Sequence, residues 1–255
     1  MEVHHHPKVE KKNFKEYFLE FLMIFLAVTL GFIAENIREK ITDHERAKIY
    51  AATMVNDLSA DTTELKIYIS YWSYAANNVD TLFQLLSVHE PKEIPSGELY
   101  WFGLFGGAPR VFIPNDATFQ QMRSAGTLRY FSNNLMQKVA QYDQLIRKMK
   151  IYENQDETIF TEVRKIRSQI FYVQFNEVAN NIFQSNKTLF SRARIDSFLR
   201  SNPPLLSNDK IIFNQYLELV RSRFMHSKVQ QANDLLIRAV ALIYDLKQEY
   251  RLNNE

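Results

Sequence analysis

Histidine has the clearest capacity for metal or acid–base chemistry in this chain, and His4–His6 place three imidazoles side by side. Neutral imidazoles are good ligands for Zn²⁺, Ni²⁺ or Cu²⁺. Three consecutive residues in a terminal tail do not hold their rings in a preorganised geometry, and no second shell is evident around them. His44, His89 and His226 are isolated and lack the HExxH spacing of zinc enzymes. We therefore predict a solvated tail rather than a metal site.

The glycine-rich stretch GLFGGAP, residues 103–109, is the next candidate, because glycine loops can cradle phosphates. It fits neither GxxxxGK[ST] nor GxGxxG, and no Lys-Ser or Lys-Thr pair follows it directly. No GxSxG motif occurs, and the absence of cysteine excludes thiol nucleophiles and Cys-ligated clusters. No carboxylate pair lies in a turn context typical of general acid–base catalysis. We therefore expect no enzymatic activity, no catalytic residue and no cofactor.

The charge balance is close to neutral, with 31 basic and 29 acidic residues and a formal net charge of +2. The basic triplets in the middle of the chain have acidic neighbours, which is typical of a solvated helix face. A nucleic-acid-binding protein presents a strong basic patch or stripe. We therefore expect no nucleic-acid partner.

An aromatic cluster accompanies the glycines in a Gly/Pro-rich segment, residues 89–114, which we expect to be a loop. Its aromatic residues are Tyr100, Trp101, Phe102, Phe105 and Phe112. Exposed on a loop, these side chains would contact a protein partner, a lipid surface or an apolar ligand. The alternative is that they fold onto the end of the helical domain, since aromatic side chains are usually buried.

The most apolar part of the chain lies near its N-terminus, where apolar or small residues run from Phe21 to Ala34. Extended back to Tyr17, the stretch is about 27 Å long as a helix, close to the thickness of a bilayer core. Sites for signal-peptide cleavage are poor, because Phe32 or Thr29 would occupy position −3. We interpret residues 17–36 as an uncleaved transmembrane anchor after a tail of residues 1–16. A cleaved signal and a buried soluble helix are the alternatives.

The orientation of this anchor is not decided by charge, because four basic residues flank it on each side: Lys8, Lys11, Lys12 and Lys15 before it, and Arg38, Lys40, Arg46 and Lys48 after it. Because the N-terminal tail is short, we expect it to stay in the cytoplasm. The anchor then lies in the inner membrane and the C-terminal domain lies in the periplasm.

Residues 37–255 carry the periodicity of long helices, and their glycines and prolines are concentrated in few places. Apolar residues recur at three- or four-residue steps through Glu35–Ser87, with one gap around Thr62. Ser132 is placed to cap a second long helix, and Gly126 to end a short one before it. A third long helix is expected from Ser207–Asp209 to about Arg251. This pattern predicts an all-α protein, in which the transmembrane helix continues into an elongated antiparallel helical bundle.

Two stretches resemble known proteins: MEVHHHPKVEKKNFKEYFLEFLMIFLAVTLGFIAENIRE at the N-terminus and NDATFQQMRSAGTLRYFSNNLMQKVAQYDQLI from Asn115. They are similar to segments of a Bacteroidetes-type family of single-pass membrane proteins. The resemblance covers less than a third of the chain. It implies a membrane anchor, a helical ectodomain and a native His4–His6 tail, and it carries no activity or catalytic residues.

These observations predict a membrane-anchored, non-enzymatic scaffold or interaction protein, whose partners are the lipid bilayer and another protein or a second copy of itself. Ala27, Gly31 and Ala34 form a face without bulk in the anchor, which favours helix packing in lipid. The alternative function is a sensor-like domain that binds a ligand between its helices and works with a separate signalling partner.

Overall fold

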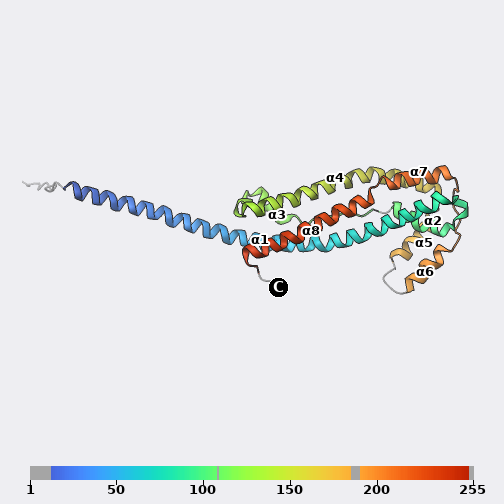
Figure 1. Ribbon diagram of the computed structural model, residues 1–255, viewed down its shortest axis with the longest axis horizontal. Helices are drawn as coiled ribbons and strands as arrows, with labels where there is room; N and C mark the ends of the chain where they lie inside the picture. The colour runs from blue at the N-terminus through green and yellow to red at the C-terminus, as the bar shows by residue number, and fades with distance from the viewer. Residues whose placement is uncertain (1–12, 108, 185–189, 253–255) are drawn as a thin grey trace, which may run out of the picture. The chain divides into compact units, whose positions relative to one another are not determined.

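The computed structural model describes residues 13–107, 109–184 and 190–252 (Figure 1). The expected tail lies mostly outside these residues, so His4–His6 and the basic residues Lys8, Lys11 and Lys12 have no structural description. The helices are α1 (Phe14–Val88), α2 (Ser96–Leu104), α3 (Ala117–Ser124), α4 (Asn133–Ile170), α5 (Val173–Gln184), α6 (Phe190–Leu199), α7 (Lys210–Arg221) and α8 (Met225–Tyr250). The described residues contain no strand beyond one isolated bridge, Phe171 to Leu205. The all-α fold class predicted from the sequence is confirmed.

The chain divides into two units, and the first comprises residues 1–50. Its described part, from residue 13, is almost entirely the beginning of α1. The most apolar window of this helix has a mean hydropathy of 2.2 and none of it is buried. By length and composition α1 is therefore able to cross a membrane, whereas a core helix of a soluble protein would bury such a segment. A signal sequence near the N-terminus would share these properties.

The second unit, residues 51–255, is a helical bundle built on the apolar stripes that the sequence predicts. In α1 the buried stripe includes Leu58, Leu65 and Trp72, and in α8 it includes Leu235 and Leu242. These positions are seven residues apart, which is two helical turns, so each helix turns one face inward. Burial of large apolar side chains, at about 1.5–3 kcal/mol each, is the main source of stability for such a bundle.

The direction of the long helices follows from contacts across the bundle. The Tyr142 hydroxyl of α4 donates a hydrogen bond to Asp61 of α1. Further along α4, Asp156 accepts a hydrogen bond from Lys228, whose ammonium group lies over the ring of Trp72 of α1. α4 and residues 51–88 of α1 therefore run parallel. Near the other end of α4, Lys138 donates to Asp245, close to the end of α8, so α8 runs antiparallel to both. The antiparallel order that we expect between long helices holds for α8 only. A parallel pair requires a return segment between its two helices, and residues 109–116 provide it.

Residues 89–114 differ from the loop that their composition suggests. They contain two 3₁₀ turns, Pro91–Glu93 and Phe105–Gly107, and between them α2. Gly97 of α2 allows close packing, because a Cβ there would lie 1.9 Å from the carbonyl oxygen of Phe198, near the end of α6. Only glycine fits this approach. The glycines of this segment therefore serve helix packing rather than loop flexibility.

The expected C-terminal helix is divided into α7 and α8. Asp209 caps α7, its side chain accepting from the N–H of Ile211 at 2.7 Å, as the sequence predicts. The break lies at residues 222–224, where Phe224 takes the left-handed conformation with φ 53°. No glycine or proline marks this turn, because tertiary contacts of the neighbouring Arg223 hold it. These contacts belong to the candidate site.

Candidate functional site

Four of the five aromatic residues expected on the loop are buried: Tyr100, Trp101, Phe105 and Phe112. Phe102 is partly exposed. The Tyr100 hydroxyl donates to the carbonyl of Pro204 at 2.8 Å and accepts from the N–H of Tyr172 at 3.0 Å. In this structure the cluster therefore packs inside the bundle, as in the alternative arrangement, and presents little apolar surface to a partner. Aromatic side chains gain more from burial than from a solvated loop.

The expected packing face of the anchor, Ala27, Gly31 and Ala34, is exposed on α1. A Cβ added at Gly31 would meet no atom within 4 Å. The face is thus open to a neighbouring helix, and self-association through it remains a prediction.

A segment that we call the strap, residues 109–116, runs along the bundle between the second 3₁₀ turn and α3. Three polar contacts hold it. The indole N–H of Trp72 donates to the carbonyl of Arg110 at 3.3 Å, and Glu153 accepts from the N–H of Phe112 at 2.9 Å. The N–H of Asn115 donates to Asp61 at 2.7 Å. Each contact satisfies strap backbone with a side chain from α1 or α4, so the strap is fixed without secondary structure.

Asp61 is the most deeply buried acidic side chain of the bundle, with 1% of its surface exposed. Its carboxylate accepts from the backbone and side chain of Asn115 and from the Tyr142 hydroxyl, at 2.7–3.0 Å. Burial raises the pKa of Asp61, although these hydrogen bonds counteract part of the effect. This residue therefore anchors the end of the strap rather than presenting a reactive carboxylate.

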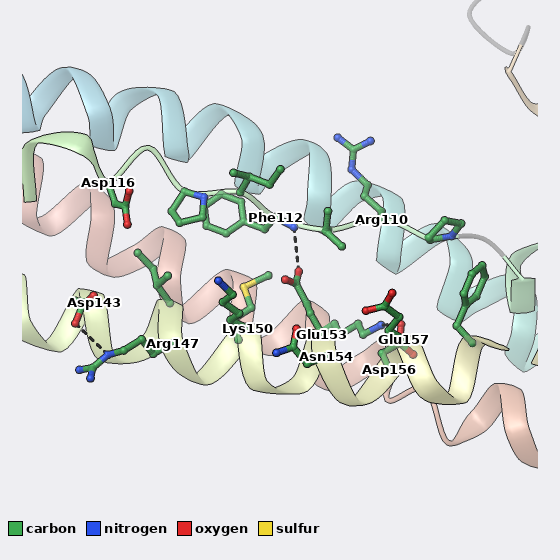
Figure 2. Close-up of a pocket in the computed structure, with 18 of the residues that line it drawn as sticks. Arg110, Phe112, Asp116, Asp143, Arg147, Lys150, Glu153, Asn154, Asp156 and Glu157 are labelled. Atoms are coloured by element: carbon green, nitrogen blue, oxygen red, sulfur yellow. Dashed lines mark hydrogen bonds and ion pairs between the residues drawn. The ribbon is translucent and has the colours of Figure 1, made fainter. Parts of the chain in front are cut away.

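A cavity of about 650 Å³ lies between the strap and α4 and extends to the start of α8 (Figure 2). Its apolar walls come from Phe112 and Ile113 of the strap and Ile146, Met149 and Phe160 of α4. Its polar lining includes Arg123, Lys150, Glu153, Asp156, Glu157, Arg223 and Lys228. This volume lies within the range of about 300–1,000 Å³ that small-molecule sites occupy.

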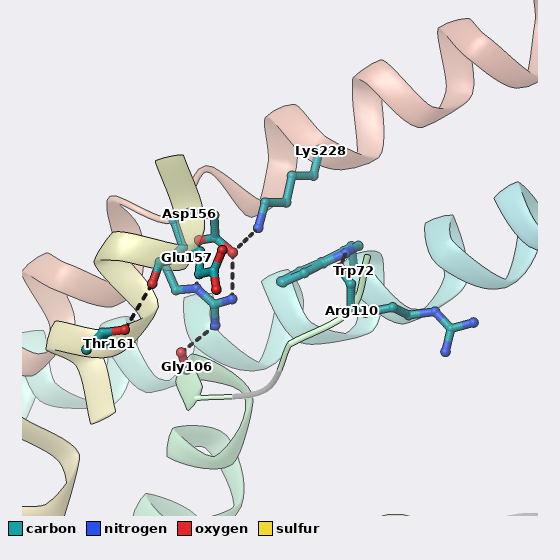
Figure 3. A network of polar contacts seen from close by, with 8 residues as sticks. Trp72, Gly106, Arg110, Asp156, Glu157, Thr161 and Lys228 are labelled. Atoms are coloured by element: carbon teal, nitrogen blue, oxygen red, sulfur yellow. Dashed lines mark hydrogen bonds and ion pairs between the residues drawn. The ribbon is translucent and has the colours of Figure 1, made fainter. Parts of the chain in front are cut away.

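A buried ionic cluster forms one end of this cavity (Figure 3). Asp156 accepts from Nε of Arg223 and from its Nη2, both at 2.8 Å, and from Nζ of Lys228 at 2.5 Å. Nη1 of Arg223 donates to the carbonyl of Gly106 at 2.6 Å. The side chains of Arg223 and Lys228 are 0% and 5% exposed. One carboxylate therefore holds two buried cations.

Gly106 is required for this arrangement. A Cβ at this position would lie 2.3 Å from the Tyr216 hydroxyl and 2.5 Å from a methyl group of Val220. A side chain would push α7 away and move the carbonyl that receives Arg223. Aromatic rings complete the cluster, with Nζ of Lys228 3.9 Å from the ring centroid of Trp72 and the Arg223 guanidinium 5.1 Å from that of Phe160.

The pKa values of the cluster reflect competition between burial and pairing. Burial alone would raise the pKa of Asp156, but the hydrogen bonds and charges of Arg223 and Lys228 outweigh it and hold that pKa below its ordinary value. Burial lowers the pKa of Lys228 to about 8, even though Asp156 favours its charged form. Burial also raises the pKa of Glu153, against the hydrogen bond from Phe112. Lys228 thus changes charge near physiological pH.

This cluster was not predicted from the sequence, although charged residues at apolar positions of two helices indicate it. The buried positions of α8 step from Met225 through Lys228 to Ala232, so Lys228 occupies a core position. Asp156 lies between Met149 and Val163 on the same three- and four-residue series of α4. A charged residue on an apolar stripe indicates a buried partner. Among the described residues, no group of three or more acidic or histidine side chains is arranged to hold a metal ion.

Comparisons of this chain with protein-family models, with curated proteins and with solved structures find no significant match. The resemblance to a Bacteroidetes-type membrane family therefore stays a prediction. Function has to be inferred from the exposed apolar helix and from the cavity.

Proposed function

We propose that this chain is a membrane-anchored, non-enzymatic scaffold or interaction protein. The apolar part of α1 would lie in the bilayer, and the bundle would present its surfaces to a protein partner. The observation that carries this proposal is that the most apolar window of α1, of mean hydropathy 2.2, is 0% buried. Apolar surface of this extent is stable only in contact with lipid or protein.

The proposed site is the inner membrane, with the N-terminus in the cytoplasm and the bundle in the periplasm. The absence of cysteine from the sequence is compatible with a periplasmic bundle. Glu35 and Arg38 follow the apolar stretch and bond to each other at 2.9 Å. Such a pair at the membrane boundary lowers the cost of placing two charges there.

The test is extraction of membranes with alkaline carbonate, followed by N-terminal sequencing of the protein. An anchored chain stays in the pellet with its N-terminus intact. Release into the supernatant would contradict the membrane anchor, and a mature N-terminus after residue 30 would identify a cleaved signal instead. Purification from a detergent extract, with mass spectrometry of the bound proteins, then tests the scaffold role. An anchored chain that copurifies with no protein would contradict that role.

A second candidate function, a ligand-binding domain with a separate signalling partner, is favoured by the cavity of about 650 Å³. Its charged groups come from α4, from α8 and from the turn before α8, so a ligand there would contact several helices at once. A ligand that binds one arrangement of these helices better than another would shift their equilibrium. The two candidates are compatible with the same membrane anchor.

A further inference from the structure

We propose that the cavity beneath the strap binds a small amphipathic carboxylate, with Lys228 as the partner of the ligand's charged group. This inference rests on the second candidate function, the ligand-binding domain, and names the chemical class of its ligand. It does not depend on the membrane anchor.

The buried cluster holds two cations on one shared carboxylate. Arg223 and Asp156 form a bidentate ion pair, and Lys228 donates to an oxygen of the same carboxylate and so adds a second positive charge. A buried cation without a counter-ion of its own is unfavourable. The carboxyl of Glu153 attracts Lys228, but the hydrogen bond that it accepts comes from the strap N–H of Phe112 and not from Lys228. An anion in the cavity would give Lys228 its own partner.

Lys228 has more N–H donors than its described hydrogen bond uses. The ammonium group of Lys228 has three N–H groups, of which one donates to Asp156 while the Trp72 ring lies against the same nitrogen. The guanidinium of Arg223 is committed to Asp156 and Gly106. The buried end of the cavity therefore offers a single cationic point. This suits a singly charged carboxylate better than a phosphate, which is best bound by several donors.

The walls of the cavity are partly apolar. Ile113, Ile146, Met149 and Phe160 give the cavity apolar surface next to its charged end. Away from the buried end, basic and acidic side chains balance each other, so no strong positive excess remains for a second negative charge on the ligand. The basic ones are Arg110, Arg123, Arg147 and Lys150, and the acidic ones are Asp116, Asp143, Glu153 and Glu157. The expected ligand therefore has one carboxylate and an aromatic or aliphatic body.

Binding of such a ligand should be coupled to protonation of Lys228. The titratable groups that act on this residue are Asp156 and Glu153 on α4 and Arg223 in the turn before α8. Tyr68 on α1, whose pKa burial raises, faces the same two carboxyl groups. Lys228 has a pKa of about 8, and a bound carboxylate raises it by favouring the ammonium form. At pH 8 the protein should therefore take up roughly half a proton on binding.

The experiment uses the full chain in lipid nanodiscs, with empty nanodiscs as the blank, and titrates four ligands of similar body by calorimetry. They are 3-phenylpropanoate, 3-phenylpropanol, 3-phenylpropylamine and 2-phenylethyl phosphate. We expect the carboxylate to bind at least tenfold more tightly than the other three. Titrations at pH 8 in two buffers of different ionisation enthalpy should reveal proton uptake, and affinity should fall about tenfold per pH unit well above pH 8.

Two variants locate the binding. Lys228→Met removes the proposed counter-ion but leaves the pair of Arg223 and Asp156 balanced, so the bundle should fold, and carboxylate binding should weaken at least tenfold. Ile146→Trp fills the cavity without touching the ionic cluster, and should also abolish binding. The matched control is Lys210→Met, which removes an exposed lysine paired with Glu90 and should leave binding unchanged. Circular dichroism of each variant checks that it is folded.

Several results would overturn the proposal: no binding of the carboxylate, equal binding of the alcohol, tighter binding of the phosphate, or full binding by folded Lys228→Met. Carbonate extraction of the same chain reports on the anchor independently. If the alcohol, the amine or the phosphate binds at least as tightly as the carboxylate and Ile146→Trp abolishes that binding, the carboxylate assignment fails while the ligand-binding function stands. If Ile146→Trp retains carboxylate binding, the ligand lies outside this cavity.

Discussion

Nζ of Lys228 lies 3.9 Å from the centre of the Trp72 ring. The same nitrogen donates a hydrogen bond to Asp156 of α4 at 2.5 Å. Lys228 and Trp72 belong to α8 and α1, so their contact joins the last helix of the bundle to the first. A cation over an aromatic face is stabilised by the ring quadrupole, by about 2 kcal/mol or more when water is excluded. The stability of this contact depends on Asp156.

Replacing Asp156 with Asn should destabilise the bundle by about 3–5 kcal/mol, because two buried cations lose their only shared carboxylate. Chemical denaturation followed by circular dichroism measures the change. Asp143→Asn is the control, since Asp143 pairs with Arg147, whose side chain is 64% exposed, and should cost under about 1 kcal/mol. Equal losses in both variants would mean that the cluster contributes no special stability.

Lys228→Met should be neutral or stabilising at pH 7, and this advantage should shrink as the pH rises to 10. The folded pKa of about 8 lies below the ordinary value of 10.5, so between these values the unfolded chain binds more protons than the folded one. The contribution of Lys228 to the stability of the native protein therefore rises with pH across this window. Denaturation of both proteins at pH 7, 8.5 and 10 measures it. A pH-independent difference between them would contradict the lowered pKa.

Phe224 should tolerate Asn better than Val. Its φ of 53° places it in the left-handed region, and its side chain is 53% exposed, so both substitutions lose similar contacts. Asn adopts this conformation readily, whereas a β-branched residue is strained there by about 1 kcal/mol or more. Thermal denaturation should give Phe224→Asn the higher midpoint. If Phe224→Val melts higher, the turn between α7 and α8 does not require a left-handed residue.

An alkaline phosphatase fused after Glu255 should be active in cells, and a green fluorescent protein at the same place, exported by the same route, should stay dark. This result follows from an N-terminus in the cytoplasm and a bundle outside it. The measurements are phosphatase activity and fluorescence of matched fusions at equal expression. A fluorescent, phosphatase-negative pair would invert the proposed orientation.

The span should self-associate through the face of Ala27, Gly31 and Ala34. Small residues let two helix backbones approach closely in lipid, and no atom lies within 4 Å of a Cβ built at Gly31. A membrane-association reporter that carries Phe18–Glu35 should give a strong signal, which Gly31→Ile should reduce. Phe25→Ile, on the opposite side of the helix from this face, is the control. Equal signals from the native span and Gly31→Ile would leave no role for this face.

The sequence alone determined the long helices α1 and α4 and the short helix α3, with most of their boundaries, because these depend on local interactions. Periodic apolar residues, the Ser132 cap, which accepts from the N–H of Leu135, and the left-handed Gly126 all act within a few residues of chain. The apolar segment at the start of α1 could also be predicted from the sequence, because it is recognised by its length and composition alone.

Tertiary structure alone decided how charged residues are paired and where the chain turns without a breaker. The gap in the stripe near Thr62 is occupied by Asp61, whose partners Asn115 and Tyr142 lie 54 and 81 residues away. Arg223 similarly finds Asp156 at a separation of 67 residues and divides the expected final helix. Periodicity indicates which face of a helix is buried, but a buried charge is stable only beside its partner, and that partner is known only once the helices are packed.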